Sequence, residues 1–573
     1  MDSKTQGKIE YWKNHLEDEE LLGELTNLIE TDEDALFDAF YRNLEFGTAG
    51  LRGVIGVGTN RMNIHTVSQA TQGLANYLNA HYENPTVAIA RDSRNMGEEF
   101  QKAAASVLAA NGVHVYLYPR IEPVPALSFA VRYLHTSAGI ALTASHNPAP
   151  YNGYKAYDEN GCQIANEAAD EISASIAETD MFEGVKAMDF DEALAQGLVE
   201  WTSDEVIDAF VDAVYTQSVP GFKASDDFKV VYTPLNGSGM ECVTKILDKI
   251  GVKHVEVVPE QAMPDGNFPT CTYPNPEFRE ALELGLKLCD EVKPDLLLAT
   301  DPDADRMGTA IPHNGEYKLL TGNEMGILLI DWLCKMHKAN NETIDDKVCV
   351  STIVSSAMPD ALARDWGFEM RRVLTGFKYI GGQIDLLKDA GEEERYMLGF
   401  EESYGYLVGT HVRDKDAIVA SMLAVEMAAY YADLGMDLYE AMDELYKKYG
   451  YFMNGIVNVS FPGATGAEKM ASIMSSLRET QPSEIAGFKV VNYIDFNDEV
   501  EMPRVSGLQK EDAQMLPKAN VLQFDLEGDM RVMIRPSGTE PKIKAYLFSN
   551  GKTREESLEV QAKLGEASKK ILS

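Results

Sequence analysis

The segment with the clearest chemistry is a short acidic loop, Asp301-Pro-Asp303-Ala-Asp305-Arg306, which directly follows an apolar stretch. Its carboxylates stand at positions i, i+2 and i+4, where they repel one another unless a cation lies between them. An EF-hand is excluded, because position six of the loop is Arg306 rather than Gly and position twelve is Pro312 rather than Glu. Few carboxylate ligands and a phosphate partner favour Mg²⁺ over Ca²⁺, and the arginine suits a bidentate phosphate contact. The alternative, a solvated acidic turn, leaves the strand-end position and the arginine unexplained.

A second candidate is a serine in an Asn-Pro turn, Leu-Thr-Ala-Ser145-His146-Asn-Pro148, which is followed by Lys155. We expect such a turn to hold the serine exposed and conformationally fixed, as a nucleophile requires. His146 is not by default a triad base for its immediate neighbour, and the sequence is not the G-x-S-x-G elbow, so acyl transfer is disfavoured. A polar turn between two elements is the alternative interpretation of this motif on its own.

A third loop, Gly399-Phe-Glu401-Glu-Ser403-Tyr-Gly405, carries carboxylate and hydroxyl groups between glycines. Such groups can take paired hydrogen bonds from sugar hydroxyls. The segment is preceded by Thr-Gly-Phe-Lys at 375–378 and followed by Arg-Asp-Lys-Asp at 413–416. Taken alone, this loop also fits an exposed acidic turn.

A fourth segment, Arg535-Pro-Ser-Gly-Thr-Glu-Pro-Lys-Ile-Lys544, combines basic side chains, two hydroxyls and a glycine that frees backbone N–H groups. These groups compose a phosphate cradle, with an ordinary surface turn as the alternative. The segment is not a Walker loop. The Gly-Lys-Thr at 551–553 has Tyr546 where the first glycine should stand.

Composition restricts the possible partners. The chain has 573 residues, with 51 Lys and Arg against 91 Asp and Glu, and a formal net charge of −40. Nucleic-acid binding is disfavoured, because it requires a basic stripe. The six cysteines are scattered without a C-x-x-C pair, which indicates reduced thiols. The N-terminus lacks a signal-peptide core, and the apolar stretch 417–432 is interrupted by Glu426 and too short to span a membrane. We therefore expect a soluble cytoplasmic protein.

The order of apolar segments predicts an α/β fold. Residues 1–45 show the pattern of acidic amphipathic helices, and a glycine-rich loop follows at 46–53. A strand at 87–90, a helix at 100–110 and a strand at 113–117 form the βαβ pattern of a parallel sheet. Apolar strands with polar ends recur at 230–236 and 348–354, which suggests three α/β units of similar size.

The last part of the chain differs from the first three units. Strands at 455–461 and 529–534 suggest a smaller α+β domain. We expect the motif loops to lie at the carboxyl ends of the strands, where open α/β sheets bind ligands. The predicted domains are 1–210 with the serine turn, 211–325 with the acidic loop, 326–450 with the Glu-Ser loop and 451–573 with the phosphate cradle.

In this order, TASHNP, DPDADR, FEES and RPSGTEPK resemble the motifs of the α-D-phosphohexomutase superfamily, the phosphoglucomutases and phosphomannomutases. The match runs from Phe46 to Lys544, nearly the whole chain. Four motifs at compatible spacings are far more specific than any one of them. The resemblance implies a four-domain enzyme, most similar to bacterial phosphoglucomutases. Three similar mixed α/β domains and a smaller C-terminal α+β domain would surround a central cleft.

The resemblance also implies roles for the motif residues. Ser145 would carry a phosphoryl group, and Lys155 would act as general acid or base, with Arg52 and His146 as further catalytic residues. That role requires the pKa of Lys155 to fall from about 10.4 through nearby cations such as Arg52. The Mg²⁺ ligands would be Asp301, Asp303, Asp305 and the phosphorylated Ser145. The substrate-binding residues would be Arg306, Thr375, Gly376, Glu401, Ser403, Lys415, Arg535, Ser537, Gly538, Thr539 and Lys544.

The activity implied is the interconversion of α-D-glucose 1-phosphate and glucose 6-phosphate, with glucose 1,6-bisphosphate as intermediate and activator. The glucose preference rests on two details. The chain reads Ser403-Tyr-Gly-Tyr406 where phosphomannomutase-like and phosphoglucosamine branches carry a His, and its Arg-Asp-Lys-Asp at 413–416 is similar to the Arg-Glu-Lys-Asp of glucomutase-type members. Phosphomannomutase and phosphopentomutase activities are the alternatives. No nucleic-acid or membrane partner is expected, and the protein would be a monomer or a weak homodimer.

Two functions from other classes remain open at this point. A haloacid-dehalogenase-like phosphatase also places D-x-D after an apolar strand, with the first Asp as nucleophile, but it expects Thr or Val where Asp305 stands. A catalytically silent sugar-phosphate-binding protein would retain only the cradle at Arg535. Release of free phosphate would indicate the first, and an unphosphorylated Ser145 without isomerase activity would indicate the second.

Overall fold

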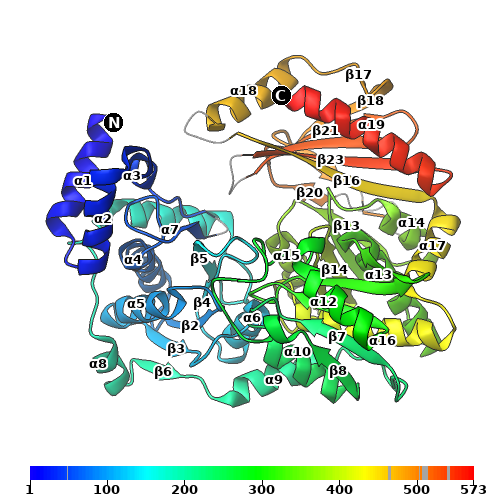
Figure 1. Cartoon of the computed structure of the whole chain (residues 1–573), viewed down its shortest axis with the longest axis horizontal. Coiled ribbons are helices and arrows are strands. Elements are labelled where there is room, and N and C mark those ends of the chain that lie inside the picture. The colour runs from blue at the N-terminus through cyan, green and yellow to red at the C-terminus, as the bar shows by residue number, and fades with distance from the viewer. Residues whose placement is uncertain (48–49, 462–465, 503, 506–513, 538–541) are drawn as a thin grey trace. The chain divides into compact units, whose positions relative to one another are not determined.

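The computed structural model describes residues 1–47, 50–461, 466–502, 504–505, 514–537 and 542–573 (Figure 1). The chain divides into two compact units. Unit 1 comprises Met1–Leu319, Ile384–Leu386 and Gly405–Ala429, and unit 2 comprises Leu320–Gln383, Leu387–Tyr404 and Tyr430–Ser573. The finer division into four domains at 210, 325 and 450 stays a prediction, as does the central cleft.

The N-terminal segment is helical, as predicted. Its helices are α1 (Ser3–His15), α2 (Glu19–Thr31) and α3 (Glu33–Phe40). Each begins after an aspartate whose side chain accepts hydrogen bonds from backbone N–H groups of the first turn, namely Asp2, Asp18 and Asp32. The buried faces meet in a small core that includes Trp12 and Leu25.

The first sheet of unit 1 has the strand order β1-β5-β4-β2-β3-β6. Its central strand β2 pairs in parallel with β3 and β4, which confirms the predicted βαβ pattern, whereas β5 is antiparallel to β4 and β1. The strands are β1 (Leu51–Val54), β2 (Thr86–Arg91), β3 (His114–Leu117), β4 (Ala138–Leu142), β5 (Tyr151–Tyr157) and β6 (Val199–Trp201). The helices of this region are α4 (Ile64–His81), α5 (Gly97–Ala110), α6 (Val124–Tyr133), α7 (Asn166–Glu178), α8 (Phe190–Ala195) and α9 (Asp204–Tyr215). The serine turn connects β4 to β5.

The second sheet has the order β11-β10-β9-β7-β8. Every residue of β9, Leu-Leu-Leu-Ala-Thr, is buried, which is typical of a strand covered on both faces. The acidic loop follows β9 and leads into the antiparallel strand β10. The strands are β7 (Lys229–Thr233), β8 (His254–Val257), β9 (Leu296–Thr300), β10 (Met307–His313) and β11 (Glu316–Leu320), and the helices are α10 (Met240–Lys249), α11 (Pro259–Ala262) and α12 (Arg279–Val292).

In unit 2, β12 (Val348–Thr352) pairs in parallel with β13 (Glu369–Val373) and β14 (Tyr396–Glu401). Glu401 is therefore the last residue of a buried strand, in agreement with the expectation that motif loops follow strand ends. The helices are α13 (Gly322–Ala339), α14 (Met358–Trp366), α15 (Phe377–Asp389), of which Ile384–Leu386 belong to unit 1, and α17 (Leu438–Tyr449). Strand β15 (Gly405–Val408) lies in unit 1, and α16 (Ala417–Asp433) begins there.

The C-terminal part of unit 2 is an antiparallel sheet with the order β16-β23-β22-β21-β18-β17. Helices α18 (Gly466–Glu479) and α19 (Arg554–Leu572) pack on one face of it (Figure 1). The strands are β16 (Tyr451–Ser460), β17 (Glu484–Ile485), β18 (Phe488–Asp495), β21 (Leu522–Leu526), β22 (Met530–Pro536) and β23 (Lys542–Gly551), with a separate pair, β19 (Val500–Met502) and β20 (Gln514–Leu516). The predicted fold class, three mixed α/β regions followed by an α+β region, is confirmed.

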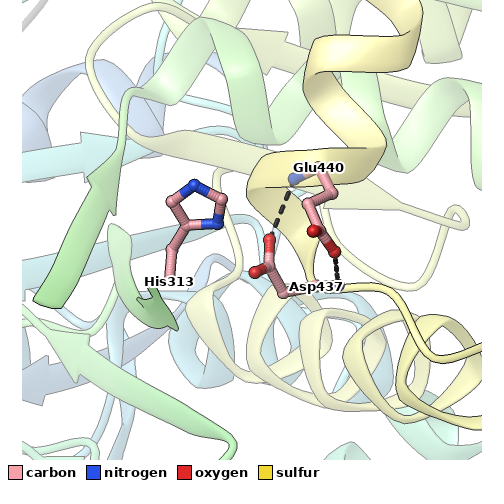
Figure 2. A group of neighbouring side chains, drawn as sticks. All are labelled: His313, Asp437 and Glu440. Carbon is pink, nitrogen blue, oxygen red and sulfur yellow. Dashed lines mark hydrogen bonds between the residues drawn. The ribbon is translucent and has the colours of Figure 1, made fainter. Parts of the chain in front are cut away.

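Helix α17 shows how local sequence sets an element boundary. The Asp437 carboxylate accepts a hydrogen bond from the Glu440 N–H at 2.9 Å, and the Glu440 carboxylate accepts one from the Asp437 N–H at 3.0 Å. Dashed lines mark both bonds in Figure 2. This reciprocal capping box satisfies two backbone donors that a helix start otherwise leaves unpaired. Both carboxylates are thereby engaged in capping the helix.

Two exclusions from the sequence can be compared with the fold. All six cysteines are free thiols, and five of them are buried. Within the described residues, no single helix is long and apolar enough to cross a membrane. Among the described helices, only the pair α16 and α17, which are bent by 83° relative to one another, has together the length and composition of a membrane-spanning segment.

The fold of unit 1 contains a buried acid whose ionisation opposes folding. Glu426 of α16 is fully buried and accepts hydrogen bonds from Ser218 Oγ at 2.5 Å and Val219 N at 2.9 Å. Burial raises its pKa from 4.5 to about 7, although both hydrogen bonds act in the opposite direction. The folded protein therefore binds this proton more tightly than the unfolded chain, and the stabilisation is complete below pH 4.5 and lost as the pH rises through 7.

We predict that raising the pH from 5 to 8 lowers the thermal unfolding midpoint of the wild type more than that of Glu426→Gln. The difference corresponds to a free energy of unfolding on the order of 3 kcal/mol, because one pKa unit is about 1.4 kcal/mol. The matched control is Glu444→Gln, at an exposed position of α17, which should follow the wild type. Parallel pH responses of the wild type and Glu426→Gln would contradict the assignment.

Candidate active site

Ser145 occupies a strained and buried position in the turn between β4 and β5. Its φ angle is +50°, in the left-handed region that non-glycine residues rarely adopt. Its backbone N–H donates to Thr143 Oγ1 at 2.8 Å, which helps to hold this conformation. The residue is only 4 % exposed, so the expectation of an exposed serine is wrong. The reason is that the acidic loop covers it, a contact from 156 positions along the chain.

The Ser145 hydroxyl contacts the acidic loop directly. Its Oγ donates to Asp301 Oδ2 at 2.8 Å and lies 3.1 Å from Nδ1 of His146. The other oxygen of Asp301, Oδ1, accepts the backbone N–H groups of Asp305 at 3.1 Å and Arg306 at 3.0 Å. Two motifs predicted from separate parts of the sequence therefore form one site in unit 1.

The three aspartates form a compact buried cluster. Asp301, Asp303 and Asp305 are 0 %, 0 % and 1 % exposed, and each offers a carboxylate oxygen within 4.8 Å of the others. Among the residues that the structure describes, the Oδ1 atoms of Asp303 and Asp305 are buried and accept no hydrogen bond. Buried polar atoms are nearly always paired, so these two oxygens fit ligands of a divalent cation.

Two lysines neutralise part of this negative charge. Lys155 Nζ, from β5, lies 2.9 Å from Asp303 Oδ2 and 3.3 Å from Asp305 Oδ2. Lys415 Nζ lies 3.1 Å from Asp305 Oδ2, and its own neighbour Asp414 accepts from it at 3.0 Å. Burial alone would raise the pKa of Asp305, but Lys415 and Lys155 outweigh it and hold that pKa well below the ordinary value. Lys415 therefore contacts the acidic loop and keeps Asp305 ionised.

The remaining charges of the cluster are set by burial and by one another. Burial, with the charges of Asp303 and Asp305, raises the pKa of Asp301 well above its ordinary value. Burial would lower the pKa of Lys155, but Asp303 and Asp305 overcome it and raise that pKa. This direction is opposite to the fall that a basic role of Lys155 requires. The physical reason is that Lys155 faces two carboxylates, while Arg52 donates to Asn147 Oδ1 at 3.2 Å.

Arg306 lies at the edge of the same loop. Its Nη1 donates to Glu277 Oε1 at 2.7 Å, and its Nε is 3.8 Å from Asp305 Oδ1. The side chain is 16 % exposed, unlike the aspartates before it. The predicted phosphate contact of Arg306 stays a prediction.

In unit 2, the structure brings the Glu-Ser loop to the segment at 375–376. Glu401 Oε1 accepts the N–H of Gly376 at 2.8 Å, and Gly376 has a φ of +124°, which favours glycine. Thr375 Oγ1 is buried and, within the described part of the chain, has no hydrogen-bond partner. Ser403 lies in the turn that follows Glu401. These residues form a small polar site whose predicted role, binding sugar hydroxyls, stays a prediction.

The phosphate cradle is described only in part. Arg535 on β22 lies opposite Lys544 on β23, and Ser537 N donates to Lys542 O at 2.8 Å. The predicted cradle residues Gly538 and Thr539 lie outside the described residues. Burial, followed by the charge of Glu402, raises the pKa of Tyr546, while a hydrogen bond with Arg535 opposes that rise.

Sequence reasoning missed several side chains of these sites. The sequence predicts no role for Tyr546. In the structure Tyr546 lies on β23 opposite Met533 of β22, the strand that carries Arg535. The sequence pattern assigns no role to Glu402, but its Oε2 accepts from Thr352 Oγ1 at 3.2 Å and Ser355 Oγ at 3.3 Å. The polar end of β2, with Asp92 and Arg94, lies against the serine turn. These two residues could have been predicted, because parallel strands β2 and β4 end at the same edge of the sheet and the serine turn follows β4.

Three family models match the chain. They are described as phosphoglucomutase/phosphomannomutase alpha/beta/alpha domains I, II and III, and they match residues 43–183, 208–315 and 321–449. The chain belongs to the phosphoglucomutase/phosphomannomutase family. The predicted membership of the α-D-phosphohexomutase superfamily is thus confirmed, and with it the prediction of an enzyme that acts as a phosphohexomutase.

Curated members of this family are similar over most of their length. The chain is 36 % identical over 505 residues to the phosphoglucomutase of Staphylococcus saprophyticus subsp. saprophyticus, covering 88 % of this chain and 90 % of the relative. It is also 36 % identical over 516 residues to a probable phosphomannomutase of Haemophilus influenzae, covering 89 % and 98 %. The crystal structure of a putative phosphomannomutase from Thermus thermophilus has the same fold, with a TM-score of 0.67, 22 % identity and coverage of 93 % and 99 %.

We predict that a divalent cation stabilises the protein through the acidic loop. Adding MgCl₂ after dialysis against a chelator should raise the thermal unfolding midpoint of the wild type, because ligand at about 100 times its Kd contributes about 2.7 kcal/mol. Asp303→Asn should lose most of this shift, since it removes one unpaired carboxylate oxygen. Glu122→Gln is the matched control, because Glu122 is a buried acid outside the loop, and it should retain the shift. Equal shifts in Asp303→Asn and the wild type would contradict the metal site.

Proposed function

We propose that this family member is a phosphoglucomutase that interconverts α-D-glucose 1-phosphate and glucose 6-phosphate. The observation that carries the proposal is the contact of Ser145 Oγ with Asp301 Oδ2 at 2.8 Å, inside a buried cluster of three carboxylates. A buried serine beside a metal-type site suits a nucleophile that receives and returns a phosphoryl group. Similarity to the Staphylococcus phosphoglucomutase supports the same activity.

The proposed cofactor is Mg²⁺, held by Asp301, Asp303 and Asp305 together with the phosphate on Ser145. The Oδ1 atoms of Asp303 and Asp305 support this ligand set, because they are buried without a hydrogen bond among the described contacts. When bound, the ion neutralises negative charge on the transferring phosphoryl group. Lys155 and Lys415 contribute positive charge at the other oxygen of Asp305, Oδ2.

In the forward reaction the phosphoryl group on Ser145 passes to the free hydroxyl of glucose 1-phosphate. The bond from phosphorus to Ser145 Oγ breaks, and a bond to the sugar oxygen forms, which gives glucose 1,6-bisphosphate. The sugar hydroxyl loses its proton to a base, and Oγ regains a proton. Nδ1 of His146 lies 3.1 Å from Oγ, within reach for this exchange. Return of the other phosphoryl group of the bisphosphate to Ser145 completes the cycle.

Lys155 and Arg52 complete the proposed catalytic group. Because Lys155 faces two carboxylates, its pKa is raised and it is an ammonium group at neutral pH. This state suits it to donate a proton to the leaving oxygen rather than to accept one. Arg52 donates to Asn147 of the serine turn, next to the nucleophile.

The remaining motif residues would bind the sugar and its unreactive phosphate. The carboxylate of Glu401, held by Gly376, and the hydroxyl of Ser403 suit sugar hydroxyls, with Thr375 beside them. Basic and hydroxyl groups suit phosphate in either orientation of the bisphosphate. The proposed phosphate ligands are Arg306, Lys415, Arg535, Ser537, Gly538, Thr539 and Lys544.

Phosphomannomutase activity is the second candidate. The probable phosphomannomutase of Haemophilus influenzae and the phosphoglucomutase of Staphylococcus saprophyticus are both 36 % identical to this chain. The Tyr404-Gly-Tyr406 sequence and Lys415 favour glucose phosphate, and phosphopentomutase activity ranks below both. A coupled assay that compares glucose 1-phosphate, mannose 1-phosphate and ribose 1-phosphate distinguishes the three. We further propose a cytoplasmic monomer or weak homodimer without membrane or nucleic-acid partners. The net charge of −40 supports the last point, because nucleic-acid binding requires a basic stripe.

We predict that Ser145→Ala abolishes interconversion of glucose 1-phosphate and glucose 6-phosphate, because no oxygen is left to carry the phosphoryl group. Intact mass spectrometry after incubation with glucose 1,6-bisphosphate should show one added phosphoryl group on the wild type and none on the variant. Ser137→Ala is the matched control, since Ser137 Oγ accepts from Thr86 N, away from the turn. Near-normal turnover by Ser145→Ala would contradict the nucleophile. Steady release of free phosphate would indicate a phosphatase instead.

We predict that Arg535→Ala chiefly weakens substrate binding. The KM for glucose 1-phosphate should rise by about 10- to 100-fold, as expected when a charged hydrogen bond worth about 1.5–3 kcal/mol is lost. The kcat should change less, because the phosphoryl-transfer residues are untouched. Steady-state kinetics measure both constants, and Arg531→Ala, on the same strand and paired with Asp525, is the control. A lower kcat with an unchanged KM would contradict the cradle role.

A further inference from the structure

The polar end of β2, Arg91-Asp92-Ser93-Arg94, has no role in the function proposed above. Strand β2 pairs in parallel with β4, so this segment and the serine turn leave the same edge of the sheet. The side chains of Asp92 and Arg94 are both 0 % exposed. A buried guanidinium requires several hydrogen-bond acceptors, and their location shows what the residue does.

Arg94 holds the whole serine turn. Its Nη2 donates to the carbonyl oxygens of Ser145 at 2.6 Å and Asn147 at 2.5 Å. Its Nη1 donates to those of Pro148 at 3.0 Å and Tyr151 at 2.8 Å. One planar group thereby fixes four carbonyls of a seven-residue stretch, from the end of β4 to the start of β5.

One of the residues that Arg94 holds is Ser145, whose backbone is strained. Ser145 has a φ of +50°, and a strained conformation of this kind persists only where its surroundings over-determine it. Its N–H donates to Thr143 Oγ1 at 2.8 Å, and its carbonyl accepts from Arg94. Both polar groups of the Ser145 backbone are therefore held, which fixes the direction of the Cα–Cβ bond and so the range of positions from which Oγ reaches Asp301 Oδ2.

The same cluster continues to the acidic loop. Arg94 N donates to Asp92 Oδ1 at 2.9 Å, and Thr143 Oγ1 lies 2.6 Å from Asp92 Oδ2 and 3.1 Å from Asp303 Oδ2. On its other side, the Arg94 guanidinium lies 5.0 Å from the ring centroid of Phe268, a cation–π contact with a buried residue that precedes α12. Arg94 thus contacts both the serine turn and the segment between α11 and α12.

We propose that Arg94 is a positioning residue for phosphoryl transfer, which sets Ser145 Oγ relative to the carboxylates of the acidic loop. The inference rests on the proposed phosphoserine function, and it adds a residue that acts through the turn and not on the substrate. A merely structural role would lower the fraction of folded protein and leave the rate per folded molecule unchanged. A positioning role lowers the rate of transfer itself.

The test is Arg94→Lys, which keeps the charge and the apolar stem. An ammonium group has three donors and no planar fork, so it cannot serve all four carbonyls. We expect single-turnover phosphorylation of Ser145 by glucose 1,6-bisphosphate, followed by intact mass spectrometry, to slow about 100-fold per folded molecule, as for misplacement by about 1 Å. The KM for glucose 1-phosphate should stay within about threefold of wild type, because KM reports binding interactions that the substitution leaves intact.

Arg91→Lys is the matched control, because Arg91 donates to Gln101 Oε1 at 3.1 Å, away from the serine turn. It should phosphorylate at the wild-type rate. A wild-type rate in Arg94→Lys, with the protein folded by circular dichroism, overturns the proposal. If Arg94→Lys does not fold, Phe268→Leu decides: a rate slower by about 3- to 10-fold is expected from loss of the cation–π contact, and an unchanged rate overturns the proposal. Failure of the wild type to become phosphorylated would refute the proposed function instead.

Discussion

The burial of three carboxylates in one short loop is the constraint on which the rest of unit 1 depends. Removing one ionised carboxylate from water has an effective penalty of several kcal/mol, and mutual repulsion adds to it. Contacts with residues from distant parts of the chain offset this penalty. Lys155 comes from β5, Lys415 from the segment before α16, and the Ser145 hydroxyl from the serine turn. The buried loop is therefore stable only together with these elements, which couples the serine turn to the metal-type site.

This coupling explains how a chain with a net charge of −40 presents cationic groups where anions would bind. Lys155 and Lys415 are almost fully buried and are fixed by carboxylates, whereas most acidic residues lie on the surface. Asp414 adds to the arrangement, because its Oδ1 accepts from Lys415 while Oδ2 accepts from the Tyr157 hydroxyl. The fixed ammonium groups lose little entropy when an anion arrives, so a few buried cations suffice.

Sequence patterns predicted the acidic loop, the serine turn and the α/β order correctly, because each has a local signature of residue type and spacing. Contacts between distant segments have no such signature. The burial of Ser145 and the raised pKa of Lys155 both arise from a loop about 150 positions away, so the sequence suggested the wrong exposure and the wrong direction. Arg94 was missed because its acceptors are backbone carbonyls, which every residue has. The contact of Lys415 with Asp305 was missed because it also joins distant segments, while its expected role in binding sugar or phosphate stays a proposal.

The burial of the nucleophile bears on why such a site would transfer a phosphoryl group rather than hydrolyse it. A phosphatase must admit water in line with the phosphoserine, whereas Ser145 is 4 % exposed and fixed through both backbone polar groups. Exclusion of water protects a reactive phosphoserine and strengthens the charges around it. A mutase additionally needs to accept the two ends of a bisphosphate in turn. The proposed chemistry rests on rigid residues of unit 1, and the proposed sugar and phosphate contacts at Glu401 and Arg535 belong to unit 2. In the proposed cycle it is therefore the bisphosphate, and not the fixed nucleophile, that changes orientation.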